Sequence, residues 1–583
     1  MSEPLVSIVI PAYNDAQTLG RAVDSCLAQT ITDIEVVIVD DASTDATPAV
    51  ADLYAQRDPR IHVVTHKENC QALEARRTGV KRACAPYILL LDGDDWLDPE
   101  VCEQSLSLAY QTEADVVCFP MVPEYGAILP DRATLEGRAC MYDAPDLDAE
   151  GDDVVHATYR DDRVVWTIIG KLFSRKLLLA TYDRVPVQRM FQCEDSYLYF
   201  IASTLADRLV SRSNLPVYHY AMGIGATRAD AQNLTASQFD SICKNYQAAL
   251  RVEEYLNTLP NPCRFKKDYA QLRFRLLADP TTRFPHAVDS GARPEAFDAM
   301  LKNWPSWEAL GWLAARHWTE PAAVLDAVQG AMSLKPRRHV CTEVIGVLCG
   351  PLELTAGQVG LTSDKRDRLE AALAEGAGMT DAQRIVFFGD VDIAGDIATQ
   401  EDVLDRLVDQ EPRDSTGLPF TDNFDIAGVH AGDCKVIEKL PTATGGCYPL
   451  RAKELDRLLR EHDVDVLVCD LSLDEPSLVW DTLVARACGV SCVVFSPAWF
   501  MATTENLRAG MADACAKMRA LQGENEGLKE SAARFEADAA RERDRADGFE
   551  KGIADVRRSV SFRLGRLLTA PLRTLRNFVH RGA

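Results

Sequence analysis

Residues 87–98, with the sequence YILLLDGDDWLD, place a strongly apolar run directly before a group of carboxylates. The apolar run predicts a strand that is buried on both faces. It ends at Asp92, Asp94 and Asp95. Neighbouring carboxylates repel one another and lose solvation unless they face water or surround a cation. Because ligands of open α/β sheets bind beyond the carboxyl ends of the strands, the segment predicts a divalent ion holding a diphosphate or, alternatively, a solvated acidic turn.

The chain before this segment alternates strands and helices. The β-branched runs 6–10, 34–39 and 61–64 each precede polar residues and a helical pattern. Successive strand-helix units predict a parallel, doubly wound sheet. Polar side chains therefore follow several strands that end at one edge of this sheet, as a nucleotide site requires.

Composition limits the class of protein. A length of 583 residues predicts three or four domains, and a net charge of −25 argues against a general nucleic-acid binder. The 17 cysteines show no paired metal-ligand spacing, and the first residues lack a signal-peptide pattern, so we expect reduced thiols and a cytoplasmic location. No apolar run is long enough to predict a transmembrane helix.

Four motifs in the first 100 residues form a recognisable series. They read VSIVIPAYN, VDDASTD, ARRTG and LDGDDW, in this order. The series resembles the family 2 glycosyltransferases of the GT-A fold. The resemblance implies a mixed α/β nucleotide-sugar-binding domain over residues 1–230.

The resemblance also implies roles for individual residues. The nucleotide-sugar site would comprise Pro11, Tyr13, Asp41, Arg76, Asp92 and Gly93. In it Asp41 would accept the uracil N3 proton, although Asp41, like Ser43, could instead cap the following helix. Asp94 would hold a Mg²⁺ or Mn²⁺ ion, with Asp95 supporting it. Such an ion stabilises the charge that grows on the leaving nucleotide diphosphate.

A second segment resembles the part of the family that supplies the catalytic base. Residues 191–196, FQCEDS, contain Glu194 and Asp195, and the resemblance implies that Asp195 deprotonates the acceptor hydroxyl. The alternative is a helix N-terminus rich in acids. The chain departs from the family pattern at three positions, where Cys70 replaces a common glycine, Arg77 an asparagine and Gly170 an asparagine. His219, on a last predicted strand at 217–220, is either a phosphate contact or a structural histidine.

The middle of the chain predicts two further domains. Residues 231–335 show helical periodicity and an aromatic group, Trp304, Trp307 and Trp312, typical of a packing or acceptor-binding extension. Residues 336–502 show strands at 384–389, 464–470 and 491–495, and resemble one Rossmann-like half of a GT-B glycosyltransferase. Because no glycine-rich fingerprint is present, we expect a binding or scaffolding module there.

The C-terminal segments differ in charge. Residues 503–555 carry a mostly apolar heptad pattern, broken by Asn525 and Glu542, that favours a coiled coil and homodimer over a solitary surface helix. Residues 556–583 hold seven arginines and no acid among apolar side chains. This basic amphipathic pattern predicts binding to an anionic membrane surface or, alternatively, to the protein's own acidic surface.

Together these features predict an inverting, metal-dependent glycosyltransferase at the inner face of the cell membrane. It would transfer a sugar from a nucleotide sugar, with UDP as the expected nucleotide, to a hydroxyl of a cell-envelope glycan or lipid-linked acceptor. Two alternatives remain open, a non-catalytic nucleotide-binding scaffold in envelope glycan assembly and a nucleotidyltransferase that releases pyrophosphate.

Overall fold

The computed structural model describes most of the first 318 residues and selected elements after them. The described residues are 3–125, 144–190, 192–222, 234–318, 324, 344–351, 353–355, 358–360, 384–391, 399–408, 418–419, 425–426, 429–430, 436–441, 446–470 and 475–495. The chain divides into two units, residues 1–500 and 501–583. The predicted coiled coil and basic tail lie in the second unit, outside the described residues.

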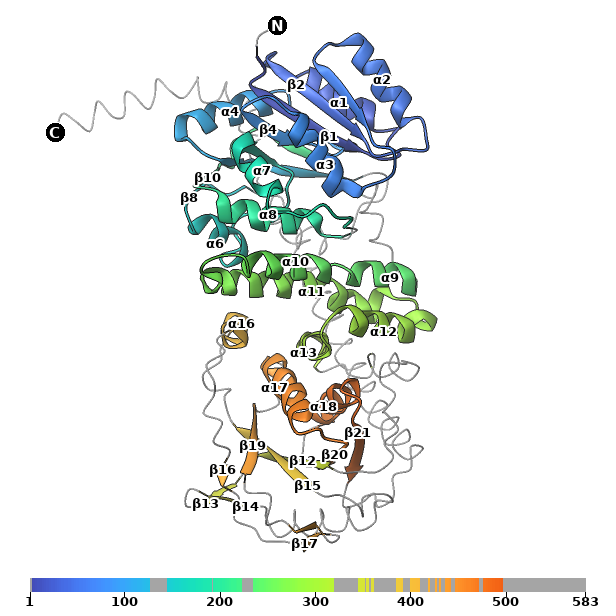
Figure 1. The fold of residues 1–583 in the computed structure, drawn as a ribbon, viewed down its shortest axis with the longest axis vertical. Helices are drawn as coiled ribbons and strands as arrows, with labels where there is room; N and C mark the ends of the chain where they lie inside the picture. Colours follow the sequence, from blue (N-terminus) through green and yellow to red (C-terminus); the bar gives the residue numbers. More distant parts are fainter. Residues whose placement is uncertain are drawn as a thin grey trace, which may run out of the picture. The chain divides into compact units, whose positions relative to one another are not determined.

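The N-terminal domain is built on a mixed sheet with the strand order β3-β2-β1-β4-β9-β6-β10-β8 (Figure 1). Its strands are β1 (Val6–Ala12), β2 (Ile34–Asp40), β3 (Ile61–Thr65), β4 (Tyr87–Leu90), β6 (Val116–Cys118), β8 (Leu147–Glu150), β9 (Lys171–Ser174) and β10 (Arg208–Ser211). The first four are mutually parallel, as predicted, and β9 runs antiparallel between β4 and β6. The predicted mixed α/β fold is thereby confirmed.

Helices follow the strands of this sheet. They are α1 (Leu19–Leu27), α2 (Thr47–Arg57), α3 (Gln71–Arg82), α4 (Val101–Thr112), α6 (Asp153–Tyr159), α7 (Arg175–Tyr182) and α8 (Glu194–Leu205). Helix α3 packs closely on β1 at Gly79. A Cβ added to this glycine would overlap the Val9 side chain. The glycine of the ARRTG motif thus lets α3 approach the sheet and fixes where the arginines of that motif lie.

A smaller sheet completes the domain. It joins β5 (Trp96–Leu97), β11 (Tyr218–Met222) and β7 (Met121–Tyr125) in the order β5-β11-β7. The predicted last strand at 217–220 therefore belongs to this smaller sheet and not to the main sheet of the domain. Its pairing with β5 places β11 beside the acidic segment that follows β4.

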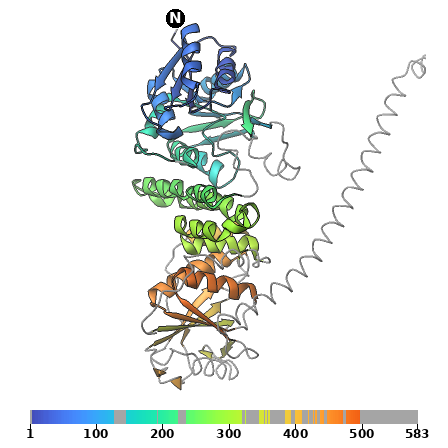
Figure 2. The ribbon, with the colours of Figure 1, turned by 90° about the vertical axis from the view of Figure 1, so that its right-hand side faces the viewer.

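A helical segment follows, shown in green in Figure 2. Its helices are α9 (Ala236–Cys243), α10 (Tyr246–Leu256), α11 (Lys266–Ala287), α12 (Arg293–Asn303) and α13 (Ser306–His317). Trp304 and Trp312 are buried in it, and the Trp304 indole N–H donates to Asn245 Oδ1 at 3.1 Å. Two members of the aromatic group predicted from the sequence thus lie in the interior of these helices, whereas the third, Trp307, is partly buried.

The last described domain has a second, mainly parallel sheet. Its strands are β12 (Val344–Pro351), β15 (Arg384–Val391), β16 (Leu418–Pro419), β19 (Val436–Pro441), β20 (Val466–Asp470) and β21 (Ser491–Phe495). Around it are the helices α16 (Gln400–Val408), α17 (Tyr448–Glu461) and α18 (Glu475–Ala487), and the short strands β13 (Glu353–Thr355), β14 (Gln358–Gly360), β17 (Asp425–Ile426) and β18 (Val429–His430).

The order of this second sheet is β16-β19-β15-β12-β20-β21. Its five parallel strands, numbered along the chain, follow the order 3-2-1-4-5 that is typical of Rossmann-like sheets. Strand β12 is central, although sequence periodicity placed the first strand of the domain only at 384. The Rossmann-like fold predicted here is confirmed.

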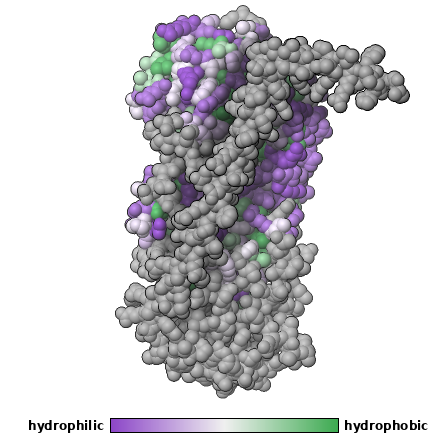
Figure 3. Space-filling model, turned by 180° about the vertical axis from the view of Figure 1, so that it is seen from behind, coloured by the Kyte–Doolittle hydropathy of each residue, from purple (hydrophilic) through white to green (hydrophobic). Residues whose placement is uncertain are grey.

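The described surface is mainly hydrophilic on the face seen in Figure 3. The exposed large hydrophobic side chains among the described residues are Tyr13, Leu53, Tyr110, Val122, Val187 and Leu250. They lie on α2, α4, α10 and β7 and, for Tyr13 and Val187, on connecting segments. Among the described helices, none has the length and apolar character needed to cross a membrane.

Candidate active site

The predicted donor-site residues lie at the carboxyl edge of the first sheet. Parallel pairing aligns Ala12 of β1 with Asp40 of β2, and Val9 of β1 with Leu90 of β4. The segments that follow these three strands therefore meet at one edge. They carry Tyr13, Asp41 and Asp92, respectively. The chain folds so that motifs far apart in sequence face one another.

Arg76 joins the donor segment to the predicted base segment. Its guanidinium donates to Asp92 Oδ1 at 2.8 Å and to Glu194 Oε1 at 3.0 Å. The side chain is buried, with 5% of the residue exposed. Since close packing at Gly79 sets the position of α3, this arginine reaches both carboxylates from a rigid helix. The structure thus brings together residues that are more than 100 positions apart.

Asp195 lies in the first turn of α8, beside this ion-pair network. Its Oδ1 accepts from the Ser196 backbone N–H at 2.7 Å. Burial, followed by the charge of Glu194, raises the pKa of Asp195 to about 7, while Arg76 opposes the rise. A carboxylate with a pKa near neutrality is well suited to accept a proton from a hydroxyl. Glu194 and Asp195 therefore lie at an acid-rich helix N-terminus, and this position is compatible with the base predicted at Asp195.

Three carboxylates, Asp15, Asp92 and Asp94, gather around Gly93. A Cβ added at Gly93 would come within 2.7 Å of Asp15 Oδ2 and 3.3 Å of the Pro11 carbonyl oxygen. Burial and the Asp92 charge raise the pKa of both Asp15 and Asp94 to about 6. Sequence analysis missed Asp15, whose position just after the PAYN motif was a usable signal.

The Asp95 carboxylate is directed into the protein, toward β11. Its Oδ2 accepts from the Tyr218 hydroxyl at 2.5 Å, its Oδ1 accepts from the Ala221 N–H at 2.7 Å, and the residue is fully buried. Burial and the charges of Asp92 and Asp94 raise its pKa to about 8. Because protein donors occupy both oxygens, Asp95 fits the supporting role and not that of a direct metal ligand. It ties the acidic segment to β11.

Asp41 contacts the turn before α3 and not the helix that follows it. Its carboxylate accepts from the Cys70 and Gln71 backbone N–H groups at 2.9 and 2.8 Å, and lies 2.6 Å from His66 Nδ1. The cap suggested for Asp41 or Ser43 is not formed, because α2 begins after Ala46 and its N-cap residue makes no side-chain hydrogen bond. Asp45, just before the helix, accepts from the Thr47 N–H at 2.9 Å. His66 was not foreseen from the sequence.

The remaining predicted donor residues, Pro11 and Tyr13, lie on the segment after β1. Tyr13 is 47% exposed, so its ring is open to a ligand. Its backbone N–H donates to Asp15 Oδ2 at 2.9 Å. Both residues therefore border the same edge as the acidic cluster.

His219 belongs to a stacked group behind the acidic segment. Its ring lies parallel to that of Trp96 at 5.0 Å, and Arg21 covers the Trp96 ring at 3.7 Å. The ring nitrogens lie 2.8 Å from Glu124 Oε1 and 3.0 Å from Asp98 Oδ1. With carboxylates at both nitrogens, the structural interpretation of His219 fits better than a phosphate contact.

Arg77, one of the departures from the family pattern, fixes the loop before the base. It is buried beside Glu74, and its guanidinium donates to the carbonyl oxygens of Tyr182 at 2.7 Å and Val185 at 2.8 Å. Glu74 in turn accepts from the Gln188 N–H at 3.1 Å. Helix α3 therefore holds both the donor residues, through Arg76, and the loop that leads to Asp195.

A second departure, Gly170, has a conformational explanation. Its φ of +68° lies in the left-handed region, which glycine and asparagine adopt more readily than other residues. The next residue, Lys171, is buried and donates to the carbonyl oxygens of Val165 and Thr167 at 2.9 and 2.7 Å. Burial lowers the pKa of Lys171 to about 8. This lysine thus holds the segment around Trp166.

The helical segment reaches the base through α6. Arg275 of α11 donates to the carbonyl oxygens of Thr158 at 2.9 Å and Tyr159 at 3.1 Å. The Tyr159 hydroxyl donates to the Ser196 carbonyl oxygen at 3.2 Å, next to Asp195. In addition, the buried Asp268 of α11 pairs with His156 of α6 and with Arg160, which directly follows α6. The helices thus support the base segment from below.

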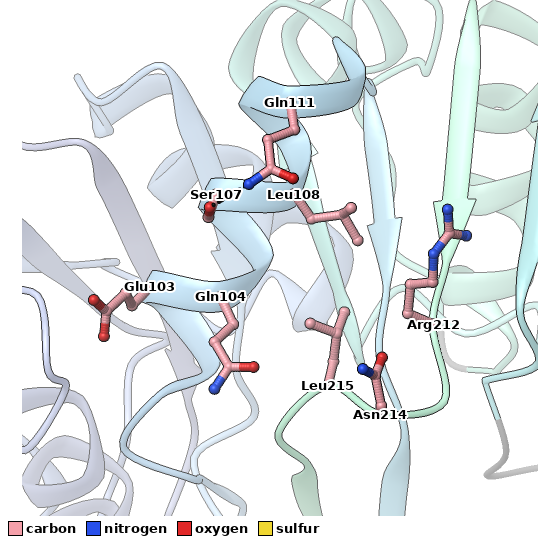
Figure 4. A pocket seen from close by; sticks show the side chains of 8 residues that line it. All are labelled: Glu103, Gln104, Ser107, Leu108, Gln111, Arg212, Asn214 and Leu215. Atoms are coloured by element: carbon pink, nitrogen blue, oxygen red, sulfur yellow. Dashed lines mark hydrogen bonds between the residues drawn. The ribbon is translucent and has the colours of Figure 1, made fainter.

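A separate groove of about 570 Å³ lies between α4 and the segment after β10 (Figure 4). Its lining is Glu103, Gln104, Ser107, Leu108, Gln111, Arg212, Asn214 and Leu215. None of the residues predicted for the donor site or the base lines it. We therefore treat it as outside the candidate active site.

The segment that carries these residues is similar in sequence to known proteins. Residues 7–165 match the model of glycosyl transferase family 2. The putative glycosyltransferase EpsH of Bacillus subtilis is 30% identical over 229 residues, which are 39% of this chain and 63% of EpsH. The chondroitin synthase of Escherichia coli is 40% identical over 115 residues, 20% of this chain and 16% of that protein. The chain thus spans less than two thirds of the length of either relative.

Solved structures give a fainter likeness. A crystal structure of Staphylococcus aureus TarS 1–349 in complex with UDP aligns with a TM-score of 0.39 and 16% identity, covering 61% of this chain and 96% of that one. The family assignment rests on the sequence matches, which cover the strands and motifs of the donor edge. Residues 7–165 of this chain therefore form a glycosyltransferase family 2 domain.

Proposed function

We propose that the protein is an inverting, metal-dependent glycosyltransferase that uses a nucleotide sugar as donor. The observation that carries this proposal is the pairing of Arg76 with both Asp92 and Glu194, which places the donor edge directly beside Asp195. A transferase needs a catalytic base that faces its donor site. A nucleotide-binding scaffold needs the donor site but no base. The family 2 match over residues 7–165 supports the same reaction class.

The acidic cluster fits a divalent ion. Asp15, Asp92 and Asp94 supply hard oxygen ligands, and among the described residues we find no hydrogen bond from another side chain to the Asp94 carboxylate. We therefore assign Asp94 as ligand to Mg²⁺ or Mn²⁺, with Asp95 as its support. A bound ion would stabilise the negative charge that develops on the leaving diphosphate.

The chain's own residues would perform the other tasks. Asp195 accepts the proton of the acceptor hydroxyl, so that the oxygen can attack the anomeric carbon on the face opposite the leaving nucleotide. Attack from that face inverts the configuration at the anomeric carbon. Arg76 orients Glu194 and Asp92, and Gly93 lets the backbone approach the donor without a side chain in the way.

Uridine is the nucleoside that we propose. Asp41 lies at the end of β2 with a buried carboxylate, and a carboxylate accepts the imide N–H that uracil presents. Three protein donors already contact this carboxylate, which fixes its orientation. Tyr13, which is exposed at the same edge, would border the base together with Pro11.

The acceptor that we propose is a hydroxyl of a cell-envelope glycan or of a lipid-linked glycan. The name of the matched chondroitin synthase refers to polysaccharide synthesis, which supports a glycan acceptor. The basic stretch 556–583 supports contact with an anionic membrane surface, and the heptad pattern of 503–555 supports a homodimer. Binding to anionic vesicles that is unchanged by deletion of 556–583 would contradict the membrane contact.

Calorimetric binding of UDP and GDP in the presence of Mn²⁺ tests the donor site. We expect UDP to bind, and we expect this binding to disappear with EDTA and in Asp94→Ala. Asp161→Ala is the matched control, because Asp161 is an exposed aspartate outside the acidic cluster. If folded protein bound neither nucleotide, the transferase proposal would be wrong and the chain would better fit a scaffold.

A further inference from the structure

Asp41, His66 and Cys70 form a second group of possible metal ligands, apart from the acidic cluster. One ligand atom from each, a carboxylate oxygen, an imidazole nitrogen and the thiol sulfur, lies within 4.8 Å of the other two. The residues come from three segments, the end of β2, the residue after β3 and the turn before α3. We propose that this group binds a thiophilic divalent cation such as Zn²⁺, and that the bound ion competes with the nucleobase for Asp41.

The ligand chemistry separates this site from the one proposed at Asp94. Zn²⁺ is commonly bound by sulfur, imidazole and carboxylate together, whereas Mg²⁺ prefers oxygen ligands alone. Three protein ligands leave one position of a tetrahedral ion for water or another small ligand. Cys70 is essential to this distinction, and it stands where the family commonly has glycine. The site is thus a feature of this chain and not of the family pattern.

The protein already holds two of the ligands in place. His66 Nε2 lies 2.9 Å from the Thr78 hydroxyl, which leaves Nδ1 directed at Asp41 Oδ1, 2.6 Å away. Hydrogen bonds of this type to the second ring nitrogen orient metal-binding histidines. Asp41 is fixed by the backbone N–H groups of Cys70 and Gln71. The thiol of Cys70 is part-exposed, so an ion can reach it from solvent.

Binding replaces protons in a balanced way. The neutral imidazole of His66 binds the ion through Nδ1 and keeps its one proton on Nε2, beside the Thr78 hydroxyl. The Cys70 thiol, which donates to the Glu68 carbonyl oxygen in the free protein, loses its proton to the buffer and becomes a thiolate. No oxidation or reduction takes place. Asp41 and His66 separate slightly to admit the ion, while Thr78 keeps the ring in its plane.

Competition with the nucleotide follows from the role of Asp41. An ion bound to its carboxylate removes the acceptor that we propose for the uracil N–H, so each ligand weakens the other by the same factor. This part of the inference rests on the proposed function. Binding of the ion itself does not, because it requires only the three side chains.

Alkylation of individual cysteines, followed by peptide mass spectrometry on the full chain, tests the site. We expect Zn²⁺ to slow iodoacetamide modification of Cys70 by at least about tenfold in the wild type, and to lose this effect in His66→Gln. Cys84, an exposed thiol beside Glu35, is the control and should react at the same rate with and without Zn²⁺. Thr78→Val removes only the orienting hydroxyl. It should raise the Zn²⁺ concentration that gives half-maximal protection by roughly 10- to 100-fold.

Two results would overturn the inference. One is Cys70 reacting equally fast with and without Zn²⁺, and the other is equal protection in the wild type, His66→Gln and Thr78→Val. Adding UDP to the wild type tests the competition apart from binding of the ion. If Asp41 binds the nucleobase, UDP should reduce the protection of Cys70 by Zn²⁺. Protection that persists in a protein shown not to bind UDP would keep the ion site and reject the nucleobase assignment.

Discussion

The two α/β domains of this protein differ in whether their buried charged side chains are paired. In the Rossmann-like domain, Arg451 and Asp481 are fully buried, and the guanidinium donates three hydrogen bonds to the carboxylate, at 2.7, 2.9 and 3.1 Å. Arg451 also donates to the Pro441 carbonyl oxygen, and the Tyr448 hydroxyl donates to Asp481. This pair connects α17 with α18 and is enclosed by the protein.

At the edge of the first sheet the charges are not balanced in this way. Arg76 is shared by two carboxylates, and Asp15, Asp94 and Asp195 all have raised pKa values because burial and neighbouring acids disfavour their ionised forms. The surplus negative charge at this partly open edge can be neutralised by a bound cation or by a proton. The enclosed pair of Arg451 and Asp481 is already neutral. The contrast supports the active site that we propose at the first edge, and it supports a structural role for the Arg451–Asp481 pair.

The largest effect on stability should come from the closed pair. Arg451→Met leaves Asp481 buried without its cation, and we expect it to lower the free energy of unfolding of that domain by about 3–5 kcal/mol. Hydrogen exchange in α17 and α18 would report the loss. Arg457→Met on the same helix is the control, because Arg457 is half exposed and its ion pairs contribute at most about 1 kcal/mol. Equal effects of the two substitutions would contradict the distinction.

Arg76→Lys tests the open network. A lysine cannot contact Asp92 and Glu194 with the fixed fork of a guanidinium, so we expect kcat/KM to fall by about 10- to 100-fold while stability changes little. Arg82→Lys, at an exposed position of the same helix, should leave both unchanged. A loss of stability as large as that of Arg451→Met would show that Arg76 is mainly structural.

Arg77→Asn restores the residue common in the family and tests the loop before the base. Removing the guanidinium leaves Glu74 and the carbonyl oxygens of Tyr182 and Val185 without this partner, at a cost of about 1–3 kcal/mol. We expect faster hydrogen exchange in residues 183–188 and a lower kcat with an unchanged KM for the donor. Unchanged exchange in this loop would remove the positioning role of Arg77.

The pH dependence should follow Asp195. Because its pKa is raised to about 7 and the base acts when unprotonated, activity is full above this value and is lost as the pH falls through it. The loss below the pKa should be about tenfold per pH unit. A profile of kcat/KM that stayed flat from pH 5 to 8 would show that Asp195 is not the base.

The fold of the first domain was predictable because its strands are apolar runs. The position of the candidate site was predictable because these runs end in polar residues. The inward direction of Asp95 was not predictable, because its partners, the Tyr218 hydroxyl and the Ala221 N–H, lie on the distant strand β11. Asp15 and His66 were missed because their partners come from distant segments. Strand β12 was missed because its glycines weaken the apolar pattern at 344–351.

The most direct test of the central claim is release of nucleoside diphosphate from a UDP-sugar by wild type, Asp195→Asn and Asp161→Asn. We predict that Asp195→Asn lowers kcat by roughly 10²- to 10⁴-fold with UDP binding intact, and that Asp161→Asn keeps full activity. Equal turnover by all three proteins would contradict the account of the first sheet edge as an active site with Asp195 as its base.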